Sequence, residues 1–137
     1  MISDKFDKTG YNAVMNHGTQ NYKDLLVWQK AMALAKAIYG LTRSFPAEEK
    51  FGLVSQMRRA AVSIPSNLAE GQARHTAGEF VQFISHAEGS AAELDTQLIL
   101  GVELGFCKKP AALPVYESIE EIRRMLNALR RAISRGK

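Results

Sequence analysis

Histidines and carboxylates that could hold a metal ion occur together in one stretch of this 137-residue chain. His86 lies close in sequence to Glu79, Glu88 and Glu93, which are residue types that bind metals inside helical bundles. Di-metal sites of that kind need a Glu-x-x-His motif on each of two helices, and that spacing is absent. We therefore expect no metal site, and we expect all three histidines to be surface or partly buried side chains. They are His17, His75 and His86.

Cys107 is the single cysteine, so it forms neither an internal disulfide nor a cysteine metal cluster. Its neighbours Lys108 and Lys109 could lower the thiol pKa and make it reactive, but a buried cysteine at a helix end is the favoured interpretation. The chain has no Gly-rich phosphate loop, no His-Glu-x-x-His, no nucleophile elbow and no Cys-x-x-Cys. We predict a non-enzymatic protein without a cofactor, located in the reducing cytoplasm.

Two adjacent arginines, Arg58 and Arg59, lie in a stretch with helical periodicity. Adjacent helix residues differ by about 100°, so at most one of the two can point inward. One interpretation is an ion pair with Glu88 or Glu93, with Glu70 helping to hold the segment. The other is a contact with phosphate. The ion pair is favoured for at least one arginine.

The charge is unevenly distributed along a chain whose net charge is +4. Residues 76–106 contain five acidic residues and no Lys or Arg, so they could pair with basic helices of the same or another subunit. Residues 107–137 contain eight basic and three acidic residues. Basic residues in a last turn complement the helix dipole, but six exceed that need, and their number indicates RNA or DNA binding if several subunits assemble. The six are Arg123, Arg124, Arg130, Arg131, Arg135 and Lys137.

Residues 1–21 are polar and lack a sustained period, so they are predicted to form a flexible arm. They also lack the pattern of a secretory signal. Residues 22–137 are predicted to form one all-α domain, because four helical segments follow and no strand alternation is seen. No apolar run is long enough to span a bilayer, so no membrane contact is expected.

The first helical segment, from about Asp24 to Ser44, carries two apolar stripes. They lie about 110° apart, which is more than one packed face needs. We expect two partners, the bundle core and a neighbouring subunit. The first stripe is Leu25, Trp28, Met32, Ala35 and Tyr39. The stripe assigned to the neighbouring subunit is Val27, Ala31, Leu34, Ile38 and Leu41.

The other three segments each carry a distinct signal. The second starts near Ala47, and Pro65 is expected to bend or interrupt it. The third starts at Thr76 with a capping box formed with Glu79, and its small central residues 89–92 predict the tightest helix crossing. The fourth has a seam typical of antiparallel packing in a bundle. The seam consists of Val115, Ile119, Ile122, Leu126, Leu129 and Ile133.

Four blocks of the sequence also resemble a known family. They are YKDLLVWQKAMALAKAIY, FPAEEKFGLVSQMRRAAVSIPSNLAEG, GEFVQFISHAEGSAAELDTQL and the run from Ile122 to Leu126. In this order they are similar to a bacterial four-helix-bundle family. That family includes proteins encoded in intervening sequences of large-subunit ribosomal RNA genes and the accessory variability determinant of diversity-generating retroelements.

The resemblance implies an antiparallel up-and-down four-helix bundle that assembles into a ring-like homopentamer. In the retroelement members a basic surface binds nucleic acid and a reverse transcriptase, so RNA, DNA or such a protein are the implied partners. The first functional hypothesis is therefore a homo-oligomeric nucleic-acid-binding scaffold that uses basic helix faces. The alternative is a protein-binding or self-assembling module that binds no nucleic acid.

Overall fold

The computed structural model describes residues 21–136. The predicted arm, apart from Asn21, lies outside this range, as does Lys137. Four long helices make up most of the described chain: α3 (Leu26–Thr42), α4 (Leu53–Gln72), α5 (Ala77–Glu103) and α6 (Lys109–Arg135). Two short 3₁₀ turns, Tyr22–Asp24 and Ala47–Glu49, precede α3 and α4, and no strand occurs between residues 21 and 136.

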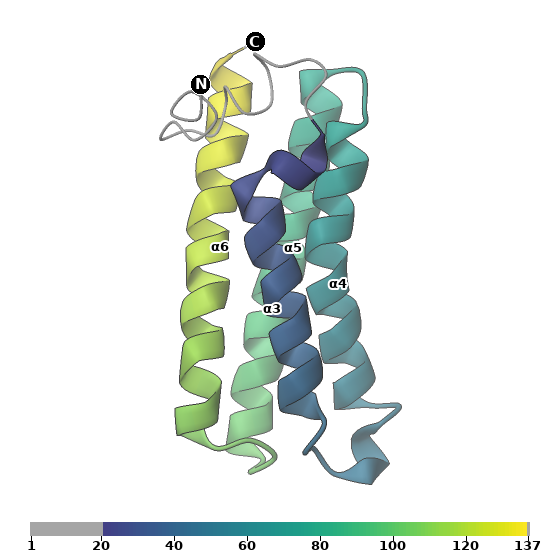
Figure 1. Ribbon diagram of the computed structural model, residues 1–137, viewed down its shortest axis with the longest axis vertical. Helices are drawn as coiled ribbons and strands as arrows, with labels where there is room; N and C mark the ends of the chain where they lie inside the picture. The colour runs from purple at the N-terminus through teal and green to yellow at the C-terminus, as the bar shows by residue number, and fades with distance from the viewer. Residues whose placement is uncertain (1–20, 137) are drawn as a thin grey trace.

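The four helices lie side by side and alternate in direction (Figure 1). The α3–α4 and α5–α6 connections lie at the lower end, and the α4–α5 connection lies at the upper end. Each helix packs against its neighbour in the sequence, and α6 packs against α3 to close the bundle. The predicted antiparallel four-helix bundle is confirmed. Within the described residues, no helix is both long and apolar enough to cross a bilayer.

The core is formed by aliphatic side chains from all four helices. The predicted seam of α6 is buried along its whole length, from Val115 to Ile133. Buried residues recur on α4 and α5 at intervals of three, four or seven residues. On α4, Met57, Ile64 and Leu68 are fully buried. This burial is the main stabilising contribution, at about 25 cal/mol for each Å² of apolar surface removed from water.

One of the two apolar stripes on α3 has a different role from the one expected. Val27, Ala31, Leu34 and Ile38 are buried inside one chain, and Leu41 packs partly buried against the same core. The stripe assigned to a neighbouring subunit is therefore a core stripe, which corrects that expectation. Branched aliphatic side chains fill an interior position well, whereas the larger aromatic residues of the first stripe carry polar atoms that need water or a partner.

Pro65 lies within α4, which runs without interruption from Leu53 to Gln72. Pro65 was expected to bend or interrupt the helix, and the interruption does not occur. Pro65 itself is buried, so packing offsets the loss of one backbone donor, which costs about 3 kcal/mol in a helix interior. Two residues after Pro65, the Asn67 Nδ2 donates to the carbonyl oxygen of Ser63 at 2.8 Å.

The starts of α4 and α5 show how local sequence sets the helix ends. α5 begins directly after Thr76, whose hydroxyl accepts a hydrogen bond from the Glu79 backbone N–H at 3.1 Å, so the N-cap half of the predicted capping box is confirmed. The Glu79 carboxylate accepts from the Thr76 hydroxyl at 3.1 Å. α4 begins six residues later than Ala47, because residues 47–49 form a separate 3₁₀ turn. There the Glu49 carboxylate accepts from the Leu53 N–H at 3.0 Å and takes the place of a cap.

The closest described glycine approach between helices is at Gly71 rather than in the small segment of α5. A Cβ added at Gly71 would lie 2.6 Å from the Phe83 Cβ and 2.9 Å from the Phe80 Cδ1. A Cβ at Gly89 would meet nothing within 4 Å, and Gly89 is exposed. Gly89 therefore takes no part in the tight crossing expected at residues 89–92, and its cost of about 1 kcal/mol against alanine is not offset within its own chain. The next residue, Ser90, does contact α4, since its hydroxyl lies 2.8 Å from that of Ser63.

Candidate functional site

The predicted nucleic-acid contacts divide into two groups on α6. Arg124, Arg131 and Arg135 follow one another at seven and four residues, so they share the outer face of the helix, and all three are exposed. Arg124 forms an i,i+4 ion pair with Glu120 at 3.5 Å, where both side chains are largely exposed. Arg131 and Arg135 form no ion pair with any residue from 21 to 136. The outer face therefore ends in two unneutralised charges.

The second group faces α5 and is neutralised there. Arg130 Nε donates to the Glu88 Oε1 at 2.9 Å, and Arg123 lies 3.8 Å from the Asp95 carboxylate. Both pairs are separated by seven residues on each helix, so they form two steps of one ladder between antiparallel neighbours. The acidic third segment thus pairs with basic α6 within a single chain. The sixth predicted contact, Lys137, lies outside the described residues.

Arg58 holds the end of α3 instead of forming an ion pair. Its Nε donates to the Thr42 Oγ1 at 3.0 Å, and an Nη donates to the Tyr39 carbonyl oxygen at 3.3 Å. Its guanidinium carbon lies 4.4 Å from the centroid of the Tyr39 ring. A cation near the last carbonyls of a helix satisfies acceptors that have no partner within the helix.

The other predicted ion-pair residues also have different surroundings. Arg59 and Glu93 line one shallow hollow of about 410 Å³ between α4 and α5, but no ion pair within the described chain joins them. Glu88 pairs with Arg130, and the Glu70 Oε2 lies 3.8 Å from an Nη of Arg74, which follows the end of α4. The proposed pairing of Arg58 or Arg59 with α5 is therefore not formed, because α3 is the nearer partner for Arg58.

Replacing Arg58 with alanine is expected to destabilise the bundle by about 1 kcal/mol, because the end of α3 loses a charged donor at a partly exposed site. The adjacent Arg59→Ala serves as a matched control, since Arg59 is exposed and its loss should change stability by less than about 0.5 kcal/mol. Urea unfolding followed by circular dichroism measures both. Equal effects from the two substitutions would contradict the assigned role of Arg58.

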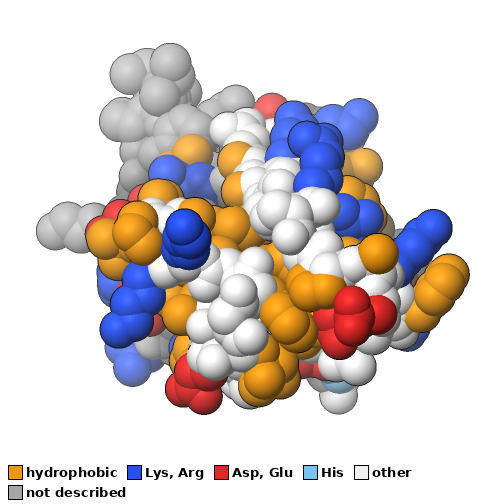
Figure 2. Space-filling model, turned by 90° about the horizontal axis from the view of Figure 1, so that it is seen from below, with side chains coloured by type: hydrophobic (Ala, Val, Ile, Leu, Met, Phe, Trp, Pro, Cys, Tyr) orange, Lys and Arg blue, Asp and Glu red, His pale blue; other side chains and the backbone are white. Residues whose placement is uncertain are grey.

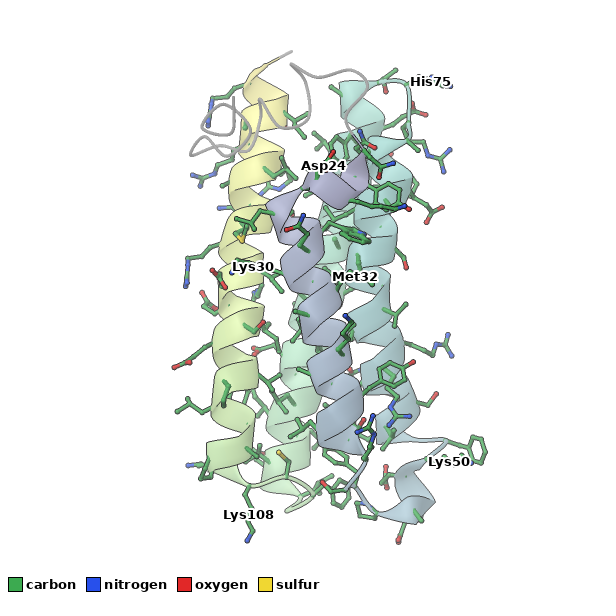
Figure 3. The ribbon with its side chains drawn as sticks, in the orientation of Figure 1. Asp24, Lys30, Met32, Lys50, His75 and Lys108 are labelled. Atoms are coloured by element: carbon green, nitrogen blue, oxygen red, sulfur yellow. The ribbon has the colours of Figure 1, made fainter. Side chains whose placement is uncertain are left out.

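A groove between α3 and α4 is lined mainly by apolar side chains, and we call it the α3–α4 groove. It consists of two adjoining hollows of about 480 and 550 Å³, which share Tyr39 and Val62. Trp28 and Met32 form its wall on α3, and Pro65 lines it on α4. Figure 3 shows that Met32 lies on the side of α3 toward α4, opposite Lys30, which pairs with Glu121 of α6 at 3.2 Å.

The α3 wall of the α3–α4 groove is formed by Trp28, Met32 and Tyr39 of the first apolar stripe. The usable signal was the type of residue within it, because Trp28 and Tyr39 carry polar atoms that favour a position open to solvent. Leu25 and Ala35 of the same stripe are nevertheless buried.

A second apolar area lies at the lower end of the bundle, where Phe51, Leu104 and Leu113 are exposed. Figure 2 shows hydrophobic side chains reaching the surface at this end, with charged side chains scattered around them.

The residues considered for chemistry are far apart. His75 lies in the α4–α5 connection at the upper end (Figure 3). His86 is exposed on α5. His17 lies outside the described residues. Among residues 21–136, no three His, Cys, Asp or Glu side chains are grouped as metal ligands would be. Cys107 is buried, as favoured, and burial raises the pKa of its thiol, which opposes the lowering expected from Lys108 and Lys109.

The fold is shared with known proteins. A solved structure described as a protein of unknown function from the S23 ribosomal protein family of Bacteroides thetaiotaomicron VPI-5482 is similar, with a TM-score of 0.69 and 19% identity. The similarity covers 76% of this chain and 97% of that one. No curated protein matches the chain. The family described as 23S rRNA-intervening sequence protein matches residues 23–128, which span all four helices except the last turns of α6. The chain therefore belongs to the 23S rRNA-intervening sequence protein family.

Proposed function

We propose that this protein is a non-enzymatic, homo-oligomeric scaffold that binds RNA or DNA through the basic outer face of α6. The observation that carries the proposal is the pair Arg131 and Arg135, two exposed cations without an acidic partner in the described chain. Cations of this kind contact phosphates without regard to sequence. The pentamer implied by the family resemblance would repeat the pair in every subunit and raise the local positive potential.

The family description refers to 23S rRNA, so a structured RNA is the first probe. Replacing both Arg131 and Arg135 with glutamine is expected to weaken RNA binding at least tenfold at about 50 mM salt. The slope of log K against log salt should fall by about one for each lost phosphate contact. Fluorescence anisotropy with labelled RNA measures both quantities.

The matched control is Lys108→Gln with Lys109→Gln, which removes the same charge from the opposite end of α6. Both lysines are exposed, so the fold should not change. Equal weakening by the two double variants would mean that only net charge matters, and the assignment to the end of α6 would be lost. Absence of RNA and DNA binding by the natural sequence at low salt would remove the nucleic-acid part of the proposal.

The α3–α4 groove favours a second candidate function, a self-assembling or protein-binding module without nucleic-acid binding. An apolar groove of this kind on a small bundle is typical of a surface that a protein partner covers. Light scattering with and without RNA at two salt concentrations separates the two functions. An oligomer that gains mass with RNA at low salt supports the scaffold, whereas an oligomer indifferent to RNA supports the second function.

A further inference from the structure

The α3–α4 groove combines an apolar floor with a positive rim. Val62 and Tyr39, at its centre, are each 42% exposed, and Phe51 at its lower end is 89% exposed. Five cations line the two hollows and no acidic residue does; they are Lys36, Arg43, Lys50, Arg58 and Arg59. An occupant should therefore be apolar along its centre and acidic at its edges.

The same groove of a second copy does not fit, because a two-fold contact would place five cations against five like charges. Like charges brought together at an interface are strongly unfavourable. The partner surface must be a different one, which makes the contact heterologous rather than isologous.

The outer face of α5 has the required complementary character. Gly89, Glu93, Thr96 and Leu100 follow one another at three or four residues and share this face, with Ile99 and Glu103 beside them. Ile99 and Leu100 are among the few exposed large hydrophobic side chains of the described chain. Glu93 and Glu103 are exposed and form no ion pair with any residue from 21 to 136. No Lys or Arg occurs on α5.

The shape of the α5 face also suits the α3–α4 groove. Gly89 leaves open space where a side chain would stand, and nothing in its own chain lies within 4 Å of that space. A glycine on an exposed helix face lets a neighbouring element approach the backbone closely. α3 has 17 residues and α5 has 27, so α5 is long enough to cover the groove from end to end.

We infer that the outer face of α5 of one copy docks in the α3–α4 groove of the next copy. This inference rests on the proposed homo-oligomer and names the two surfaces that form its contact. A head-to-tail contact between two different surfaces leaves one free surface of each kind on every pair of copies. Repetition of the contact closes into a ring when its rotation allows.

Two substitutions block the contact from opposite sides. Gly89→Arg adds bulk and positive charge to the α5 face, and Val62→Arg fills the centre of the groove with the same charge as its rim. Both positions are exposed, so circular dichroism should show an unchanged bundle. Gly40→Arg is the matched control, because Gly40 is also an exposed helical glycine with nothing within 4 Å of an added Cβ.

Light scattering is expected to give an oligomer for the natural sequence and for Gly40→Arg, and the mass of one chain for each blocked variant. The decisive sample is an equimolar mixture of the two blocked variants. The Gly89→Arg copy keeps an open groove and the Val62→Arg copy keeps an open α5 face, so the mixture should form a species of two chains. Neither variant alone should form it.

The remaining outcomes distinguish failure of this contact from failure of the proposed homo-oligomer. If the natural sequence is an oligomer and both variants remain oligomers, this contact is wrong while the proposed homo-oligomer stands. If both variants dissociate but their mixture stays monomeric, the two surfaces do not meet each other and the inference fails. If the natural sequence is a monomer, the homo-oligomeric part of the proposed function fails together with the inference.

Discussion

Ile38→Lys is expected to unfold the bundle rather than to split an assembly into folded subunits. Ile38 is 0% exposed and lies in the core stripe of α3. The substitution removes about 1.5–3 kcal/mol of apolar burial and places an ammonium group among apolar side chains at a cost of several kcal/mol. The sum approaches the whole stability of a small domain, about 5–15 kcal/mol. Far-UV circular dichroism should show loss of helix.

The neighbouring substitution Ala37→Lys isolates the effect of burial. Ala37 is exposed on the same turn of α3, so a lysine there should leave the circular dichroism spectrum and the unfolding midpoint almost unchanged. A folded, monomeric Ile38→Lys protein would mean that the stripe of Leu34 and Ile38 faces a neighbouring subunit after all.

Gly71→Ala is expected to destabilise the protein although alanine is the better helix former. The new methyl group would lie 2.6 Å from the Phe83 Cβ, which is attached to the α5 backbone and cannot rotate away. Overpacking of this kind costs about 1–3 kcal/mol, whereas the gain in helix propensity is about 1 kcal/mol. The cost exceeds the gain as long as α4 and α5 stay packed together. The midpoint of urea unfolding should therefore fall.

Gly40→Ala provides the comparison, since an added methyl group there meets nothing within 4 Å. This variant should be stabilised by up to about 1 kcal/mol, because only the propensity gain acts. A rise of the unfolding midpoint in both variants would show that the α4–α5 crossing yields easily and that Gly71 is not needed for it.

The number and order of the helices could be predicted because each has strong local signals. The α6 seam, the Thr76 cap and the apolar period of α4 each depend on residues within one segment. Which α3 stripe faces the core depends on how α4 and α6 pack against it, and within α3 only the polar atoms of Trp28 and Tyr39 favour one assignment. Local pattern therefore predicted two apolar faces but wrongly placed the stripe of Leu34 and Ile38 at a subunit contact.

The candidate site was predictable in the same limited way. The excess of cations near the C-terminus is visible in the sequence, and the i,i+4 pair of Arg124 and Glu120 follows from spacing alone. The neutralisation of Arg123 and Arg130 depends on the register between α5 and α6, which a single sequence does not contain. A carboxylate partner was likewise expected for at least one of Arg58 and Arg59, whereas Arg58 donates to the Thr42 hydroxyl and the Tyr39 carbonyl oxygen at the end of α3.

The up-and-down topology also bears on how fast the protein folds. The main helix contacts of the described chain join consecutive helices, and the contact of α3 with α6 joins distant parts of the chain. Helical bundles rich in local contacts fold in microseconds to milliseconds, because little chain entropy is lost before contacts form. Each subunit should therefore finish folding long before it meets another subunit. The rate at which any assembly forms is then set by protein concentration, and dilution delays it without slowing the folding of each chain.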